Sequence, residues 1–262
     1  VCASGVGLFY PAPESALLLP LMVIAGMAGG MVWAAIPAFL RARMNTNEIL
    51  VTLMMTYIAT LLLSLLVHGP WRDPDGYNYP QTALLPDAAM FELFDPMYRL
   101  NTSILITVVA VFAMWFFTER SFFGYKMSVG GAAPLAARYA GFKQSGSIWM
   151  GLLISGSLAG IAGMAEAAGP LGQLSAQISP GYGFAAIIVA FIGRLHAVGI
   201  VLGGLLLSLL YLGGEAVQLS LGLPSALTSI FQGMLLFFLL ASDFLIFYRF
   251  TPSPKPTKGG VT

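Results

Sequence analysis

Residues 49–67 read ILVTLMMTYIATLLLSLLV, an unbroken run without a charged side chain. About 20 consecutive apolar residues cross the hydrocarbon core of a bilayer as an α-helix, so this stretch has the length and character of a membrane span. The composition of the whole chain agrees, because 58% of its 262 residues are hydrophobic and only 9% are charged. A soluble domain carries about 25% charged residues. So few charges cannot cover a water-exposed surface, which indicates that lipid solvates most of this chain.

Further apolar segments recur along the chain and predict an all-α fold, a polytopic bundle of transmembrane helices in a single domain over residues 1–262. The spans that we expect lie at about 17–40, 49–67, 103–117, 148–168 and 226–248. The apolar segments 184–193 and 198–214 are shorter, and the polar sequence RLHAV lies between them. We therefore expect residues 184–214 to form a broken or re-entrant helix pair, since irregular backbone at membrane depth survives only where protein or water covers it.

The basic residues are distributed unevenly between the connecting segments, and the positive-inside rule converts this bias into an orientation. Nine of the 12 Lys and Arg residues fall after the first span, within residues 119–146, or after the last span. Placing these regions in the cytoplasm predicts a cytoplasmic C-terminus and leaves residues 69–99 outside. That segment is acidic and rich in proline, and we expect it to form an ordered external loop.

The chain gives no sequence basis for chemistry or for nucleic-acid binding. It contains one cysteine and two histidines, which do not form a cluster with metal-ligand spacing. It contains no G-x-S-x-G, H-E-x-x-H or Walker A motif. The net charge of +1 provides no electrostatic attraction to a polyanion. We therefore expect no catalytic residue, no metal and no nucleic-acid partner.

The sequence SVGGAAPLAARYAGF, residues 128–142, lies between two long apolar segments and is too short to cross a membrane. Proline suits the first turn of a helix and glycine the left-handed position just past its end, so Pro134 and Gly141 predict a helix over about 133–140. One face of this helix then collects four larger side chains, Leu135, Arg138, Tyr139 and Phe142. So short a helix buries little surface by itself. It is either a knob that fits a groove on another protein or a connector on the membrane surface.

Residues 124–142 resemble the cytoplasmic coupling loop of ABC-importer permeases of the ribose/branched-chain amino acid type, which docks on the ATPase subunit. The positions that match the family are Gly124, Gly130, Ala136, Ala137 and Gly141. Ala132 stands where Asn is common, and Phe142 stands where Ile is common. The resemblance implies that this loop couples the chain to an ATPase. The coupling residues that we expect are Gly124, Gly130, Pro134, Leu135, Ala136, Ala137, Arg138, Tyr139 and Gly141.

Residues 47–86 resemble one branch of that family, the nucleoside and simple-sugar permeases that work with basic-membrane-protein-type lipoproteins. The matching positions are Asn47, Glu48, Thr52, Leu53, Met54 and Tyr57, followed by the loop HGPWRDP, whereas Thr56 replaces the usual Asn. The resemblance covers about residues 17–248 and lacks the first spans of the family. We therefore expect N-terminal spans to be missing from this sequence.

The resemblance implies a permease subunit of an ATP-driven ABC importer, which translocates nucleosides across the bacterial plasma (inner) membrane as a multi-pass protein. It implies that the chain is not an enzyme and needs no cofactor, because ATP and Mg²⁺ are held by a partner. The implied partners are an ABC ATPase subunit, a second permease subunit that is a related but distinct chain, an external substrate-binding lipoprotein, the small-molecule solute and the lipid bilayer.

The candidates for the translocation path are polar and aromatic: Glu48, Thr52, Thr56, Tyr57, Glu166, Tyr182 and Phe184. Structural explanations stand beside this one, because Glu48 also suits a helix N-terminus and threonines also bond the carbonyls of their own helix. Glu166 equally fits a solvated loop. The aromatic candidates favour a nucleobase as cargo. A simple sugar is the first alternative, and an ATP-independent channel or secondary carrier is the second.

Overall fold

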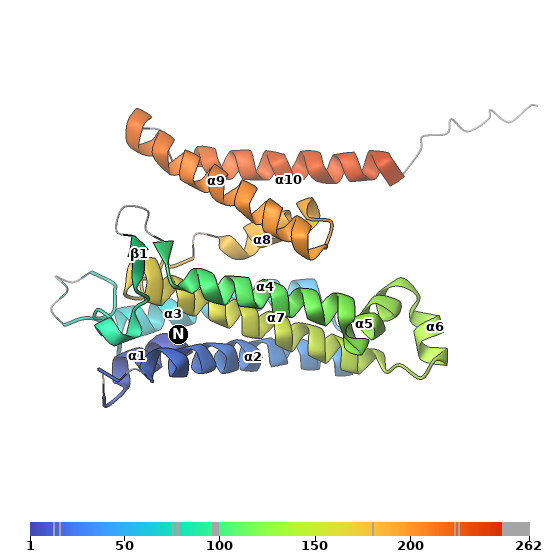
Figure 1. The fold of residues 1–262 in the computed structure, drawn as a ribbon, viewed down its shortest axis with the longest axis horizontal. Coiled ribbons are helices and arrows are strands. Elements are labelled where there is room, and N and C mark those ends of the chain that lie inside the picture. Colours follow the sequence, from blue (N-terminus) through green and yellow to red (C-terminus); the bar gives the residue numbers. More distant parts are fainter. Residues whose placement is uncertain are drawn as a thin grey trace, which may run out of the picture. The chain divides into compact units, whose positions relative to one another are not determined.

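The computed structural model describes residues 1–247 except positions 13, 16, 75, 77, 78, 96–99, 180, 223 and 225. The chain divides into two compact units, Val1–Pro180 and Gly181–Thr262, and each is described by itself. Helices carry most of the regular structure, as Figure 1 shows, and the predicted all-α fold is confirmed. Among the described residues, the only strands are β1 (Leu93–Asp95) and β2 (Leu100–Asn101), which pair antiparallel.

The first unit is built on long apolar helices that lie alongside one another (Figure 1). They are α2 (Leu18–Met44), α3 (Glu48–His68), α4 (Ser103–Arg120) and α7 (Gln144–Glu166). The short helix α1 (Cys2–Phe9) packs on α2, and α7 continues into a single π-helical segment, η2 (Ala167–Leu171). All four long helices have the length and hydropathy of a membrane span. None of the residues of α4 is buried within the chain, as expected of a helix that faces lipid or a partner.

The most extensive helix contact of the first unit joins α2 to α7, which run antiparallel. Gly26 and Gly30 on α2 lie against Gly160 and Gly156 on α7. A Cβ added to Gly30 would collide with the carbonyl oxygen of Gly156, and one added to Gly160 would collide with that of Gly26. Small residues at this spacing let helix backbones approach closely within a membrane. The two G-x-x-x-G pairs therefore hold α2 and α7 together through their backbones.

The described residues between α3 and α4 form a cap at the end of the unit where α3 and α7 finish. Its backbone pairs with the chain that follows α7, because the N–H of Leu85 donates to the carbonyl of Gly172 at 2.8 Å. The N–H of Thr82 donates to the carbonyl of Leu174, and the buried Thr82 hydroxyl accepts from the Leu174 N–H, both at 3.0 Å. The predicted external loop, 69–99, includes positions 75, 77, 78 and 96–99, which lie outside the described residues, and its position outside the cell stays a prediction.

Two small cores lie beneath this cap. The larger contains Ala3, Leu18, Met22, Leu85, Ala89, Phe91, Met164 and Ala168. The second contains Leu63, Val67, Ala167 and Leu174, and it joins the end of α3 to η2. The buried apolar residues of the first unit are therefore concentrated at the capped end, where the loops need a core, while the helix flanks keep their large apolar side chains exposed.

The second unit is a helical hairpin with a third helix against it. Helix α8 (Tyr182–Ile192) runs antiparallel to the first half of α9 (Ala197–Leu221), and α10 (Ala226–Phe247) contacts both. The residues buried between them are Ala185, Ile188 and Leu207. The turn of the hairpin is tight, with Arg194 and Leu195 at positive φ of 48° and 58°. Left-handed backbone at such residues costs about 1–3 kcal/mol each, so packing of the hairpin must hold the turn in place.

Helix α9 runs further than its hydropathy predicts. The expected segment ended at residue 214 because Glu215 and Gln218 follow, but the helix continues to Leu221 and ends at Gly222, whose φ is 65°. The helix therefore extends beyond the apolar segment expected to end at 214, because a solvated polar side chain does not interrupt a helix backbone, whereas a left-handed residue does. With 25 residues α9 has the length of a full span. The expected break is present as the turn at 193–195, and a re-entrant path for α8 stays a prediction.

Candidate coupling surface and translocation residues

The loop between α4 and α7 contains two short helices at the end of the first unit opposite the cap (Figure 1). Ser121 is extended and caps α5 (Phe122–Ala132), because its hydroxyl accepts from the Phe123 N–H at 3.0 Å. Gly124 is buried in the sharp bend between α4 and α5. A Cβ there would collide with the carbonyl oxygens of Phe117 and Thr118, so the bend requires glycine.

Helix α6 (Pro134–Tyr139) has the two ends that the sequence predicts, although it is shorter by a residue at each end. Pro134 occupies its first position, where a missing N–H costs nothing. Gly141 has a φ of +80°. The Gly141 N–H donates to the Arg138 carbonyl at 3.1 Å and the Phe142 N–H to the Ala137 carbonyl at 2.9 Å. This pair of bonds is a Schellman motif, which satisfies the last carbonyls of the helix.

One side of α6 is open to solvent and the other is not. Leu135 is 75% exposed and Tyr139 is 94% exposed, whereas Ala137 is 5% exposed. Arg138 and Ala136 are also exposed. We call this set, Leu135, Ala136, Arg138 and Tyr139, the exposed α6 face. Gly130, on α5, has open space where a Cβ would lie.

Phe142 does not belong to the exposed α6 face, which corrects the prediction that it shares a side with Leu135. The prediction assumed that the helix continues, but the left-handed residue Gly141 reverses the chain direction first. Phe142 is turned back onto α5, where its ring meets that of Phe122 edge to face at 6.1 Å. The Lys126 ammonium lies 5.3 Å from the centre of the Phe142 ring.

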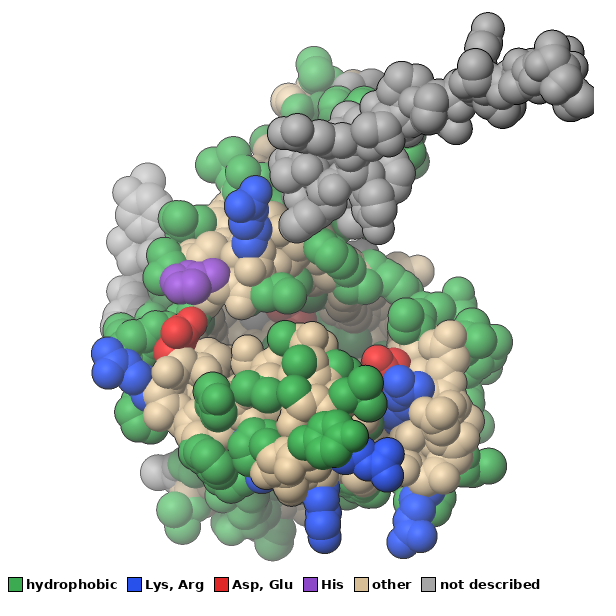
Figure 2. Space-filling model, turned by 90° about the vertical axis from the view of Figure 1, so that its right-hand side faces the viewer, with side chains coloured by type: hydrophobic (Ala, Val, Ile, Leu, Met, Phe, Trp, Pro, Cys, Tyr) green, Lys and Arg blue, Asp and Glu red, His purple; other side chains and the backbone are tan. Residues whose placement is uncertain are grey.

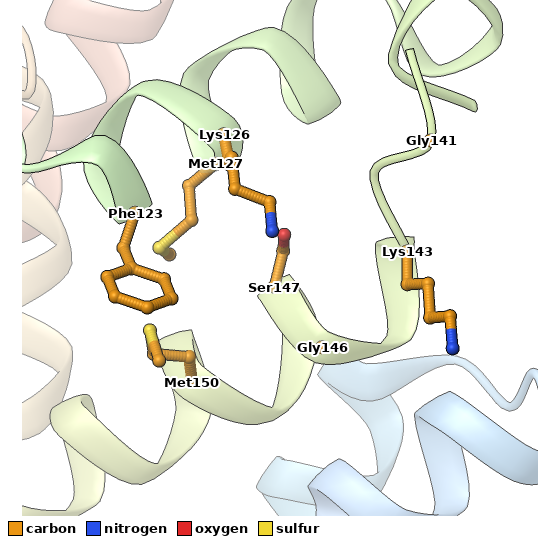
Figure 3. A pocket seen from close by; sticks show the side chains of 8 residues that line it. All are labelled: Phe123, Lys126, Met127, Gly141, Lys143, Gly146, Ser147 and Met150. Carbon is orange, nitrogen blue, oxygen red and sulfur yellow. The ribbon is translucent and has the colours of Figure 1, made fainter. Parts of the chain in front are cut away.

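A hollow of about 440 Å³ lies beside α5, between it and the start of α7. Its lining residues are Phe123, Lys126, Met127, Gly141, Lys143, Gly146, Ser147 and Met150. In Figure 3, the Lys143 side chain points away from that of Lys126. Figure 2 views this end of the first unit and shows Lys and Arg side chains projecting among hydrophobic ones. The end of the unit is therefore cationic and partly apolar.

The start of α3 is fixed by a polar clamp. Asn47 caps the helix, since its side-chain oxygen accepts from the Ile49 N–H at 3.0 Å. Glu48 also pairs with Arg41, with 3.3 Å between Oε2 and Nε, and Arg41 donates to the carbonyl of Thr46 at 3.0 Å. This ion pair was not predicted from the sequence. The signal for it was the opposite charge of two residues on either side of a short turn.

The threonines of α3 bond their own helix. The hydroxyl of Thr52 donates to the carbonyl of Glu48, that of Thr56 to Thr52, both at 2.9 Å, and that of Thr60 to Tyr57 at 2.8 Å. These bonds agree with the structural explanation given from the sequence, in which threonines bond the carbonyls of their own helix. Tyr57 is 64% exposed on the same helix. Whether these residues face a solute stays a prediction.

The first unit does not bring its two acidic candidates together. Glu48 begins α3, whereas Glu166 ends α7 beside Ala167, which packs against Val67 at the other end of α3. Tyr182 and Phe184 belong to the second unit, at the start of α8. The ring of Tyr182 lies edge to face with that of Tyr211 at 5.7 Å, a partner that the sequence analysis did not single out.

Comparisons with known proteins give the family. Residues 2–240 match a family described as the permease component of branched-chain amino acid transport systems. A glucose ABC transporter permease protein of Haloferax volcanii is 36% identical over 242 residues, which are 88% of this chain and 63% of that protein. A guanosine ABC transporter permease protein of Bacillus subtilis is 31% identical over 247 residues, 92% of this chain and 69% of that protein.

A nucleoside ABC transporter permease protein of Lactococcus lactis is 27% identical over 247 residues, 91% of this chain and 67% of that protein. The chain therefore spans 63% to 69% of the length of these curated relatives. No solved structure matches the chain. The family match and the apolar helices confirm the resemblance stated from the sequence: this chain is an integral membrane protein that belongs to the branched-chain amino acid transport system permease component family.

Proposed function

We propose that this chain is the membrane-spanning permease subunit of an ATP-driven ABC importer, and that the exposed α6 face docks on an ATPase subunit. The observation that carries the proposal is the geometry of α6. Proline at its start and a Schellman motif at its end fix a six-residue helix, yet its largest side chains point away from the chain. Exposed aromatic and arginine side chains on a rigid element are typical of a protein interface.

In this mechanism the chain itself performs no chemistry, and ATP with Mg²⁺ is held by the partner. ATP binding and hydrolysis displace α6, and the displacement passes through α5 into α4 because Gly124 packs α5 against the end of α4. The motion biases the spans between inward-open and outward-open states. The α2–α7 pair moves as one body, since its glycine contacts leave no room for sliding.

The proposal fixes an orientation and a set of partners. The loop that carries α6 and the C-terminus lie in the cytoplasm of a bacterial cell, and the cap faces outward, where a substrate-binding lipoprotein delivers the solute. A second permease subunit, related to this chain but distinct, completes the membrane-spanning pair. The excess of Lys and Arg around α5 and α6 supports this orientation.

We propose nucleosides as the cargo. The exposed aromatic side chains of Tyr57, Tyr182 and Phe184 offer stacking surfaces for a base, and the Bacillus and Lactococcus relatives are guanosine and nucleoside permease proteins. A simple sugar is the second candidate, favoured by the glucose permease protein of Haloferax. Uptake of labelled guanosine by vesicles holding the complete transporter, competed with glucose and then with uridine, separates the two. If glucose competes and uridine does not, a sugar replaces nucleosides as the proposed cargo.

The docking proposal is tested by co-purifying this chain with the ATPase encoded beside it, with and without Arg138→Glu plus Tyr139→Ala. The wild type is expected to retain the ATPase and the double variant to lose it. A matched control, Arg43→Glu plus Tyr125→Ala, makes the same changes at exposed positions off α6 and is expected to retain it. If the wild type binds no ATPase and solute crosses without ATP, the chain is a channel or a secondary carrier.

A further inference from the structure

Lys126 lies on α5, one turn beyond Phe122, and its ammonium is surrounded by aromatic rings. It is 5.6 Å from the ring centre of Phe122, 6.0 Å from that of Phe123 and 5.3 Å from that of Phe142. The rings of Phe122 and Phe142 are edge to face, with an interplanar angle of 89°. We call these four residues the lysine–phenylalanine cluster. A cation within about 6 Å of an aromatic ring centre is attracted by the ring quadrupole.

The cluster sits where it controls the position of α6. Phe142 directly follows Gly141, and its N–H closes the last turn of α6 by bonding Ala137. At the other end, only Ala133 separates α6 from α5. Because Phe142 packs on α5, the C-terminal end of α6 is held against α5. With both of its ends attached to α5, α6 moves only together with α5. Because Gly124 packs α5 on α4, α6 is connected through α5 to a membrane-spanning helix.

The other lysine of the same loop lacks this arrangement. Lys143 lines the same hollow, but no described aromatic ring lies within cation–π distance of it, and Figure 3 shows its side chain pointing away from Lys126. Lys126 is half-buried and Lys143 is exposed. An ammonium partly withdrawn from water gains more from a ring than an exposed one does. The interaction is therefore specific to one lysine of the loop.

We propose that Lys126 is a positioning residue for coupling: it makes α5 and α6 one rigid body, so that displacement of α6 by the ATPase is transmitted to α4. This inference rests on the proposed function. It separates two roles within one short loop. The exposed α6 face binds the ATPase, and the lysine–phenylalanine cluster converts that binding into motion of the spans.

The test uses the complete transporter in vesicles, with Lys126→Met, Lys126→Arg and the matched control Lys143→Met. Methionine keeps the length and apolar stem of the side chain and removes the charge, whereas arginine keeps a cation that stacks on rings. ATPase co-purification, ATP hydrolysis and solute uptake are measured for each. The ratio of ATP hydrolysed to solute imported is the decisive readout, because a loss of folded protein lowers both rates and leaves the ratio unchanged.

Lys126→Met is expected to retain the ATPase while uptake falls about tenfold, so that the ratio rises by the same factor. Lys126→Arg and Lys143→Met are expected to stay within about twofold of wild type. A second variant, Phe142→Leu, removes a ring and keeps the lysine. It should raise the ratio like Lys126→Met, and combining the two should add little, as expected for groups that act on each other.

Three results would overturn the inference. Unchanged coupling in Lys126→Met shows that the cluster transmits nothing. Loss of the ATPase from Lys126→Met, with retention in Lys126→Arg, makes Lys126 a direct docking residue. An equal rise of the ratio in Lys143→Met makes the effect one of net charge. Failure of the wild type itself to bind an ATPase is different, because it removes the proposed function as a whole.

Discussion

Gly30 of α2 and Gly156 of α7 meet backbone against backbone, and a Cβ on either glycine would collide with the carbonyl oxygen of the other. Two antiparallel helices therefore touch through their main chains at this crossing. The contact has no flexible side chain that can adjust, so any added atom must move a whole helix. This crossing therefore has no room for a larger residue at either glycine.

Gly30→Leu is expected to force α2 and α7 apart and to destabilise the protein by about 1–3 kcal/mol or more, the cost of overpacking a filled interface. Thermal unfolding in detergent, followed by the fraction of monodisperse protein, measures the effect. Gly163→Ala on α7 is the control, because nothing lies within 4 Å of the position of its Cβ. Equal melting temperatures for Gly30→Leu and wild type would show that the two helices do not pack in this way.

Thr82→Val is expected to weaken the cap. The buried Thr82 hydroxyl accepts the N–H of Leu174, and valine leaves that donor without its partner at a cost of about 1–3 kcal/mol. Faster hydrogen exchange at the Leu174 amide is the measurement. Thr118→Val, which removes an exposed hydroxyl bonded to the carbonyl of its own helix, should leave the cap unaffected. Unchanged exchange in Thr82→Val would argue that the cap is held by its apolar core alone.

Gly141→Ala is expected to weaken the end of α6. A side chain at a φ of +80° is strained, by roughly 1 kcal/mol. The exposed α6 face then loses its fixed geometry, and less ATPase should co-purify. Gly131→Ala lies in α5 with open space around it and should bind normally. Full retention of the ATPase by Gly141→Ala would mean that docking does not need the Schellman motif.

Arg41→Gln and Glu48→Gln are expected to have similar small effects on stability, about 0.2–1 kcal/mol each, because the pair is partly exposed. The double variant should cost little more than either single one, since both remove one interaction. Thermal melting of the four proteins completes the cycle. If Glu48→Gln alone abolishes uptake while melting normally, Glu48 belongs to the translocation path as well as to the clamp.

Local backbone requirements could be read from the sequence, and contacts between distant elements could not. Pro134 and Gly141 predict the ends of α6 because each restricts its own φ. The position of Phe142 was missed because a periodicity rule assumes an unbroken helix. The ring cluster around Lys126 was missed for the same reason, since it forms only after the chain turns back at Gly141.

The glycine pairs illustrate the same limit. The four-residue spacing of Gly156 and Gly160, and that of Gly26 and Gly30, indicates a close helix contact. A single sequence does not show which two helices form that contact. Hydropathy located the long helices to within a few residues, but the apolar segment in α9 ended at residue 214, before the helix ends at Leu221. Polarity reports where a side chain meets water, whereas a helix ends where its backbone turns, at Gly222.

The cap has a mechanical consequence. Its backbone bonds to the chain after α7, together with the core that joins Val67 to Ala167, staple the finishing ends of α3 and α7 to each other. Among the described residues, no backbone pairing joins α3 to α7 at the opposite end, where the Arg41–Glu48 pair connects α3 to α2 instead. A change in the tilt of α3 and α7 therefore displaces their capped ends least. The displacement grows along each helix and is largest at the end of the first unit that carries the exposed α6 face.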